Sequence, residues 1–281
     1  MLSHSSILLV ASKSDIASMN ILNNLTELVD FEPTNLAFKG KEILFSKKLG
    51  AYLLVIDDEL IRADYLEALP SSFTRLIFLS RHSSQSKLPS LLVHFPGNWT
   101  SDNSMGGKPR ELSVADPEIL KKFVMKLLQY RREEVIPREY EVGIEVTHHG
   151  PTINRACTFI EIGSDIENWK DSRVGMIVAK VIVESIGDLG SINISAKIGF
   201  GGPHYAPKFL SVIIRDPEIF IGHIAPKYVI NELDEAMIRK AIERSMVPID
   251  GALLDWKGLN SKQRKRIMGI LEEIGLGYIK I

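Results

Sequence analysis

The chain alternates short apolar runs with abrupt polar, glycine or proline clusters, and this pattern restricts its fold more than any other feature. Runs such as 7–10, 51–56, 76–79 and 90–94 have the length and composition of buried strands. Longer stretches between the runs begin at residues that cap helices, including Asp15, the pair Asp116-Pro117, and Asp171. Because strands interleave with helices along the chain, the sequence predicts an α/β fold.

The second half of the chain continues this alternation. Strands are expected over residues 140–147, 158–163, 195–198 and 278–281, and short apolar runs lie at 210–214 and 219–221. Helices are expected to start at Asn231 or Asp234 and at Ser261, and to end near residues 244 and 275. No change in composition marks a linker, so residues 1–281 are expected to form a single domain.

Composition narrows the cellular setting and the class of partner. The single cysteine, Cys157, cannot form an intramolecular disulfide, which favours a reducing compartment such as the cytoplasm. The N-terminus lacks the features of a signal peptide, and no apolar stretch approaches the roughly 20 residues of a membrane helix, so no membrane association is expected. The net charge is −1, so a nucleic acid would have to be held by local basic patches. Residues 121–138 and 262–266 offer two such patches, although charge alone favours solvated helix faces.

Six of the seven histidines follow or join an apolar run, and only His4 lies in the unpatterned N-terminus. In an open α/β sheet, ligands bind beyond the carboxyl ends of the strands, where such histidines would converge. A single histidine in this position is more often a hydrogen-bonded structural residue, but six in similar positions favour shared chemistry. The six are His82, His94, His148, His149, His204 and His223.

Two acidic segments accompany these histidines. In the stretch that begins at Glu145, alternation places His149 on the face of Glu145 and His148 on the apolar face, so both reach one ion only if the strand has already ended. Glu161 lies within an apolar run, where a buried carboxylate needs a cation or a metal as partner. Exposure of Glu161 on a solvent-facing side of the strand is the alternative.

A six-residue pattern, His-x-Ala-Pro-Lys-aromatic, occurs at 204–209 and again at 223–228. The first copy follows a glycine-rich turn, Gly201-Gly202-Pro203, which would fix the position of His204. An aromatic ring beside a lysine can stack on a nucleic-acid base while the amine contacts a phosphate. Two loops with solvated lysines are the structural alternative.

Motifs at 147–151 (Thr-His-His-Gly-Pro), 161–163 (Glu-Ile-Gly) and 199–209 resemble those of the D-aminoacyl-tRNA deacylases of the archaeal and plant type, which include D-tyrosyl-tRNA deacylases. Residues 222–228 fit the same family, and the resemblance extends over nearly the whole chain. It implies a single α/β hydrolase domain with a mixed sheet and helices on both faces, similar to phosphorylases and peptidyl-tRNA hydrolases. It also implies a zinc-dependent, monomeric enzyme whose substrate is tRNA charged with a D-amino acid, and whose reaction releases the free amino acid as part of translation quality control.

The resemblance and the motifs together suggest a role for each candidate residue. The residues expected around the metal or the attacking water are His148, His149, Glu161 and His204. The expected catalytic histidines are His149, His204 and His223, the last as a further ligand or as the acid for the leaving ribose hydroxyl. Residues expected to hold the tRNA end are Lys208, Lys227, Tyr205, Phe209 and Tyr228. Arg81, His82 and His94 are expected at the rim of the site.

Three other functions fit part of the sequence. A peptidyl-tRNA hydrolase or a zinc amidohydrolase would use a similar pocket on a different substrate. A non-catalytic RNA-binding module would need basic patches and aromatic residues but no clustered histidines. A relative of the purine nucleoside phosphorylases would need a site for free phosphate, and the sequence contains no clear one.

Overall fold

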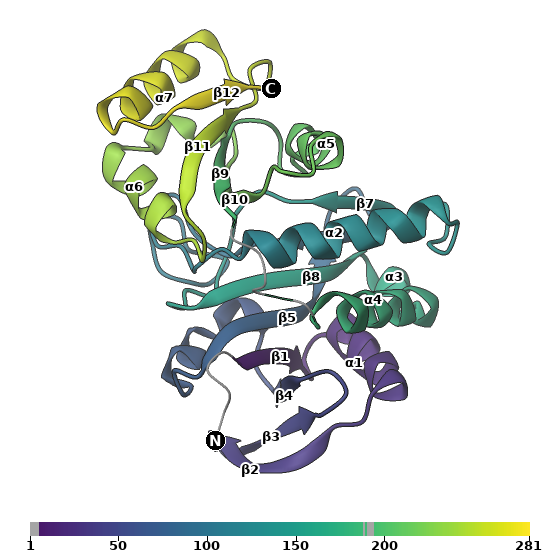
Figure 1. Ribbon diagram of the computed structural model, residues 1–281. Helices are drawn as coiled ribbons and strands as arrows, with labels where there is room; N and C mark the ends of the chain where they lie inside the picture. Colours follow the sequence, from purple (N-terminus) through teal and green to yellow (C-terminus); the bar gives the residue numbers. More distant parts are fainter. Residues whose placement is uncertain (1–5, 188, 190–193) are drawn as a thin grey trace.

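The structure is a computed structural model that describes residues 6–187, 189 and 194–281. It contains two β-sheets, a larger one formed by the first two thirds of the chain and a smaller one formed by the C-terminal third (Figure 1). The expected α/β class is confirmed, but the division of the strands between two sheets was not predicted.

The larger sheet has eight strands in the order β2-β3-β4-β1-β5-β8-β6-β7. Its centre, β4-β1-β5-β8, is parallel, whereas β6 runs antiparallel to β8, and β2 and β3 pair antiparallel at one edge, so the sheet is mixed as expected. The strands are β1 (Ser6–Ser12), β2 (Glu32–Phe38), β3 (Lys41–Ser46), β4 (Ala51–Ile56), β5 (Phe73–Ser83), β6 (Ser90–His94), β7 (Glu141–Ile144) and β8 (Ala156–Ser164).

One face of this sheet is covered by α1 (Ile16–Leu28), α2 (Pro117–Arg132) and α4 (Ser172–Ser185), which share a core with residues such as Leu9, Ile77 and Ile160. The short helix α3 (Ile166–Lys170) precedes α4. The opposite face carries Leu8, Phe78 and Phe159, and it packs against two 3₁₀ helices, η1 (Leu60–Arg62) and η2 (Asp64–Ala68). In the described part of the chain, α-helices cover only one face of this sheet, so the expectation of helices on both faces is wrong for it.

The smaller sheet has four parallel strands in the order β10-β9-β11-β12. The strands are β9 (Ala196–Phe200), β10 (Ile221–Ala225), β11 (Ile249–Leu254) and β12 (Tyr278–Lys280). Here α-helices do cover both faces, because α5 (Pro207–Arg215) joins the core of the larger sheet while α6 (Glu235–Glu243), α7 (Ser261–Glu273) and η3 (Ile230–Glu232) build a separate core.

Most predicted helix starts coincide with observed N-caps. Asp15, Asp116 and Asp234 each accept a hydrogen bond from a backbone N–H in the first turn of α1, α2 and α6. The last helix is capped by Asn260 rather than by Ser261. The apolar run 210–214 lies in α5, and β2, β3 and β11 were not predicted.

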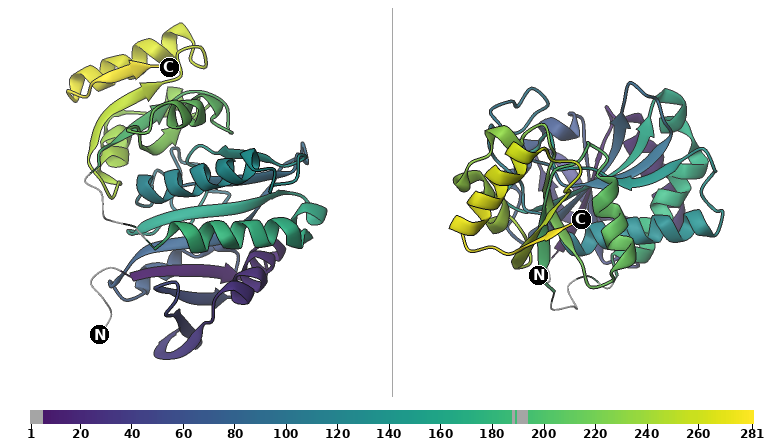
Figure 2. Two further views of the ribbon diagram at one scale, coloured as in Figure 1. Left: turned by 45° about the vertical axis from the view of Figure 1, so that its right-hand side comes forward. Right: turned by 90° about the horizontal axis from the view of Figure 1, so that it is seen from above.

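The segment that follows β7 joins the two sheets (Figure 2). The backbone N–H of Val146 donates to the carbonyl of His204, and the N–H of Thr147 donates to the carbonyl of Ile224, each at 3.0 Å. Residues 146 and 147 therefore pass directly beside the turn after β9 and the carboxyl end of β10. None of the helices in the described part of the chain is long and apolar enough to cross a membrane.

Candidate active site

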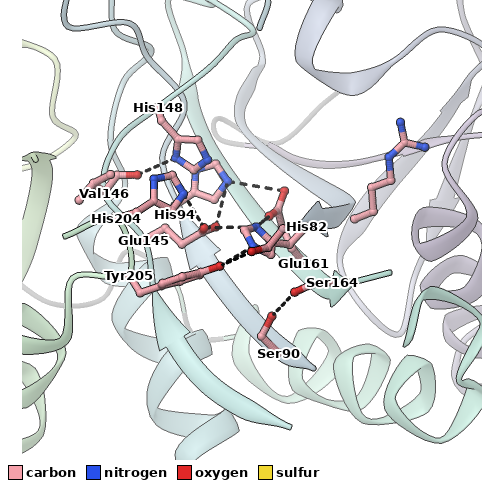
Figure 3. Close-up of polar contacts among 12 residues, drawn as sticks. His82, Ser90, His94, Glu145, Val146, His148, Glu161, Ser164, His204 and Tyr205 are labelled. Carbon is pink, nitrogen blue, oxygen red and sulfur yellow. Dashed lines mark hydrogen bonds and ion pairs between the residues drawn. The ribbon is translucent and has the colours of Figure 1, made fainter. Parts of the chain in front are cut away.

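A cluster of histidines and glutamates lies where the two sheets meet (Figure 3). The larger sheet supplies His82 and His94 from the carboxyl ends of β5 and β6, and Glu161 from β8. The segment after β7 supplies Glu145, His148 and His149, and the turn after β9 supplies His204. A cavity of about 800 Å³ is bordered by five of them, His82, His148, His149, Glu161 and His204, while His94 and Glu145 lie behind it.

The backbone after β7 allows both adjacent histidines to face the cluster. The strand ends at Ile144, and His149 adopts a left-handed conformation with φ of 46°, which breaks the alternation of side chains. The rings of His148 and His149 lie 4.4 Å apart, and both contact His94, at 4.3 and 4.8 Å. The strand has therefore ended before His148 and His149, as it must if both are to reach one ion.

The rings of His94, His148 and His149 are held in one tautomer. The Nδ1 atom of each lies within 3.2 Å of a backbone carbonyl, those of Phe95, Val146 and Gly150. A carbonyl only accepts hydrogen bonds, so Nδ1 carries a proton, and in the neutral form of each ring Nε2 has the lone pair. Metal-binding histidines are usually oriented in this way, and one ring nitrogen of each of the three lies within 4.8 Å of the others.

Glu145 is a fully buried carboxylate surrounded by three histidines. Its Oε1 lies 2.9 Å from Nε2 of His204 and 3.2 Å from Nδ1 of His82, and its Oε2 lies 3.9 Å from Nε2 of His94. Among the described residues no donor is aligned for a hydrogen bond to either oxygen, nor has Nε2 of His94 an aligned partner. These buried polar atoms are therefore available to a cation or to a proton shared with the histidines.

Glu161 is the second buried carboxylate, and its oxygens lie 3.6 Å from both His82 and His94. Burial alone would raise the pKa of Glu161, but the two histidines outweigh it and lower the pKa. In return, although burial disfavours its charged form, Glu161 and Glu145 raise the pKa of His82 to about 9 and also raise that of His94. The expectation that Glu161 is buried and paired is met.

The pKa values of His148 and His149 shift in the opposite direction, downward. Burial, followed by the nearby His94, lowers the pKa of His149 to about 3, and burial with the same neighbour lowers that of His148 well below its ordinary value. Both rings are therefore neutral near pH 7, which is the protonation state that binds a metal ion.

His204 is partly exposed, with about a third of its side chain accessible. While its Nε2 faces Glu145, its Nδ1 lies 3.4 Å from the hydroxyl of Tyr228, which also borders the cavity. The neighbouring Tyr205 lies 3.1 Å from Nε2 of His82 through its own hydroxyl. His204 thus connects a buried carboxylate with the space that a substrate would fill.

Comparison with known proteins identifies the family. Residues 69–279 match the family model described as D-aminoacyl-tRNA deacylase. The chain belongs to the D-aminoacyl-tRNA deacylase family. The D-aminoacyl-tRNA deacylase of Thermococcus onnurineus is 36% identical over 279 residues, which are 97% of this chain and 98% of the relative. That of Methanocaldococcus jannaschii is 36% identical over 281 residues, 98% of this chain and 99% of the relative.

A crystal structure described as a conserved protein of unknown function has the same fold. It superposes with a TM-score of 0.84 at 30% identity and covers 98% of this chain and 95% of its own. The resemblance to D-aminoacyl-tRNA deacylases that the sequence motifs indicated is therefore confirmed over nearly the full length.

In this deacylase the second copy of the repeated pattern has a structure different from the first. His204 lies in a turn before α5, whereas His223 lies inside β10 and is 1% exposed. The Nε2 of His223 faces the carbonyls of Ser113 and Arg244, at 3.0 Å each, and its Nδ1 faces the hydroxyl of Thr147. Both nitrogens already have partners within the protein, so this geometry lends no support to the expected role of His223 as a ligand or acid.

The residues expected to hold the tRNA end are also separated by the structure. Phe209 is fully buried and packs against Gly199 in the core, so it is not accessible to adenine. Tyr205 and Tyr228 are exposed, and Tyr228 borders the cavity. Lys208 is exposed on α5 outside the cavity lining, whereas Lys227 lies in the turn after β10, so the two loops are not a symmetric clamp.

Three central residues of the cluster were not predicted as such from the sequence. His82 and His94 were expected only at the rim, yet they lie at its centre, 7% and 0% exposed. Glu145 was noted for its position in the alternation but not as a site residue. A signal was available for all three, since each lies at the end of an apolar strand of the larger sheet or directly after it.

Proposed function

We propose that this protein hydrolyses the ester that joins a D-amino acid to the 3′-terminal adenosine of tRNA, releasing the amino acid and a tRNA that can be charged again. Membership of the D-aminoacyl-tRNA deacylase family supports the substrate. The reaction would remove mischarged tRNA and so serve the accuracy of translation. The observation that carries the chemistry is the contact between His204 and Glu145 at the cavity.

Ester hydrolysis needs a group that takes a proton from water and returns one to the leaving ribose oxygen. His204 fits this role because its Nε2 lies 2.9 Å from Oε1 of Glu145, while its Nδ1 lies on the side of Tyr228 at the cavity. Glu145 then orients the ring and stabilises the imidazolium that forms when Nδ1 accepts the proton. The same proton at Nδ1 is delivered to the departing ribose oxygen, so one histidine completes the cycle without His223.

A zinc ion is the proposed cofactor, and the donor set fits it. His94, His148 and His149 each present Nε2 to a shared space, and three histidines with one open position form a known type of catalytic zinc site. When bound, zinc lowers the pKa of water to about 7 and polarises a carbonyl. This assignment retains His148 and His149 from the sequence prediction and replaces Glu161 and His204 by His94.

Glu161 and His82 then act as positioning residues. Glu161 balances the charge on His82, and Nε2 of His82 lies 3.1 Å from the hydroxyl of Tyr205. Tyr228 is placed to stack on the terminal adenine, because more than half of it is exposed beside the cavity.

Further proposals concern the protein as a whole. We propose a single-domain monomer in the cytoplasm, and the one buried, free cysteine supports the reducing compartment. A relationship of the fold to phosphorylases and peptidyl-tRNA hydrolases is likewise proposed, supported by the parallel strands at the centre of the mixed sheet.

The reaction is tested by incubating the protein with D-tyrosyl-tRNA and following release of free tyrosine. N-acetyl-D-tyrosyl-tRNA and a simple aryl amide serve as comparators for the peptidyl-tRNA hydrolase and amidohydrolase alternatives. We expect rapid release from the free aminoacyl ester only. Preference for the acetylated ester or for the amide would replace the proposed reaction.

A further inference from the structure

A second cavity, of about 430 Å³, adjoins the active-site cavity. Tyr228 borders both cavities, so its ring separates them. The side chains that line the second cavity include two lysines and several amides: Lys227, Lys257, Asn231, Asn260 and Gln263. No carboxylate belongs to this lining among the described residues.

The smaller sheet explains why the lysines lie beside the active site. Strands β9, β10 and β11 are parallel, so their carboxyl ends lie along one edge. His204 follows β9, Lys227 follows β10 and Lys257 lies in the turn after β11. The edge that supplies the catalytic histidine therefore also supplies two cations.

The turns that carry the lysines are fixed by hydrogen bonds. The backbone N–H of Lys227 donates to the carbonyl of Gly202 at 3.0 Å, and its carbonyl accepts from the side chain of Gln263 at 2.9 Å. The turn around Lys257 is held by the N–H of Gly258, which donates to Asp255 at 2.9 Å. The positions of both side chains are therefore set by backbone that does not need a ligand to order it.

The charges of the two lysines are not neutralised within the protein. In the described part of the chain, neither ammonium lies within ion-pair distance of a carboxylate. The nearby carboxylate of Asp255 is 3% exposed and is directed into the turn. A cavity with two free cations and amide groups fits an anion with several acceptor oxygens, such as a phosphate.

We propose that this cavity binds a backbone phosphate of the tRNA 3′ strand, on the 5′ side of the terminal adenosine. The inference rests on the proposed function, because the ester and its adenosine would occupy the active-site cavity. The RNA strand must then leave past Tyr228, and each nucleotide carries a phosphate in that direction. Tyr228 would stack on the base while Lys227 and Lys257 contact the phosphate.

The test compares two substrates that share the ester and its adenosine but differ in the rest of the tRNA. D-tyrosyl-tRNA contains the 3′ strand, whereas D-tyrosyl-adenosine carries the same ester without any phosphate. Lys257→Ala should raise KM for the tRNA substrate roughly five- to tenfold and leave hydrolysis of the adenosine ester within twofold of wild type. The salt dependence of tRNA binding should also become less steep, by a slope of about 0.7 for one lost contact to a single strand.

A matched control uses Lys47, an exposed lysine in the turn after β3 of the larger sheet. Lys47→Ala should change neither substrate's KM nor the salt dependence. Lys227→Ala should reproduce the effect of Lys257→Ala. Binding of uncharged tRNA to each variant, measured by fluorescence anisotropy, keeps this inference separate from the proposed reaction, because it needs no hydrolysis.

Three results would overturn the proposal. Equal losses on both substrates would show that Lys257 supports the fold or the chemistry. Unchanged tRNA binding in Lys227→Ala and Lys257→Ala would show that the strand leaves by another path. Binding of inorganic phosphate that depends on Lys257 but does not compete with tRNA would show a site for the free anion.

Discussion

Replacement of Glu145 by glutamine tests the proposed His204–Glu145 pair with little change in shape. The amide oxygen of Glu145→Gln can still accept from Nε2 of His204, but the negative charge is lost. At an effective dielectric constant of 20, two charges about 4 Å apart interact by roughly 4 kcal/mol, and the observed atoms are 2.9 Å apart. If about 2 to 4 kcal/mol of this stabilises the imidazolium in the transition state, kcat should fall roughly 30- to 1000-fold.

The assay is single-turnover hydrolysis of D-tyrosyl-tRNA at saturating enzyme, with KM measured separately. KM should stay within about threefold, because Glu145 is buried and does not face the tRNA. His204→Ala should reduce kcat by roughly 100-fold or more. The kcat of the double variant should be little lower than that of the less active single variant, since the two residues act as a unit.

Glu161→Gln is the matched control, because Glu161 is the other buried carboxylate but pairs with His82 and His94 rather than with His204. The loss of kcat caused by Glu161→Gln should multiply with the loss of kcat caused by His204→Ala. Metal content and thermal unfolding of every variant separate catalysis from stability. If Glu145→Gln retains kcat within threefold, or if its effect multiplies with that of His204→Ala, the reasoning is refuted.

Three other predictions follow from the same contacts. Phe209→Ala should lower the free energy of unfolding by about 3 to 5 kcal/mol without changing KM, whereas Tyr228→Ala should raise KM roughly tenfold or more. Denaturant titration measures the first effect and steady-state kinetics the second. A raised KM in Phe209→Ala with no change in Tyr228→Ala would place Phe209 in the site. Burial lowers the pKa of His223 to about 4, so between about pH 6.5 and 4 the unfolded chain binds a proton that the folded chain does not. As the pH falls across that window, the free energy of unfolding of wild type should decrease by up to about 3 kcal/mol more than that of His223→Gln. Parallel curves of unfolding free energy against pH for the two proteins would contradict this. Protein purified without chelator should contain zinc by elemental analysis and lose it in His148→Ala; full activity of metal-free wild type would exclude the proposed ion.

The sequence was informative where local chemistry decides the structure. Capping at Asp15 and Asp116 depends on one side chain and the next turn, so the starts of α1 and α2 were predicted correctly. The buried strands β4 and β6 were predicted at their observed bounds, because a continuous apolar run needs no information from the rest of the chain.

The sequence was less informative where distant segments decide the structure. Strand β2 is a largely exposed edge strand that lacks an apolar run, so its pairing with β3 left no clear local signal. The same six-residue pattern forms a turn at His204 and a strand at His223, because hydrogen bonds to Ser113, Thr147 and Arg244 are long-range. Convergence of histidines was predictable, but their individual roles required the fold.

The most direct test of the account is the ratio of kcat/KM for D-tyrosyl-tRNA to that for L-tyrosyl-tRNA, measured on the same tRNA preparation. Wild type should hydrolyse the D-ester with a large preference, and His204→Ala should lose most of that activity while still binding tRNA. Equal hydrolysis of the two esters, or hydrolysis of neither, would contradict the proposal that this histidine and glutamate cluster is the active site of a D-aminoacyl-tRNA deacylase.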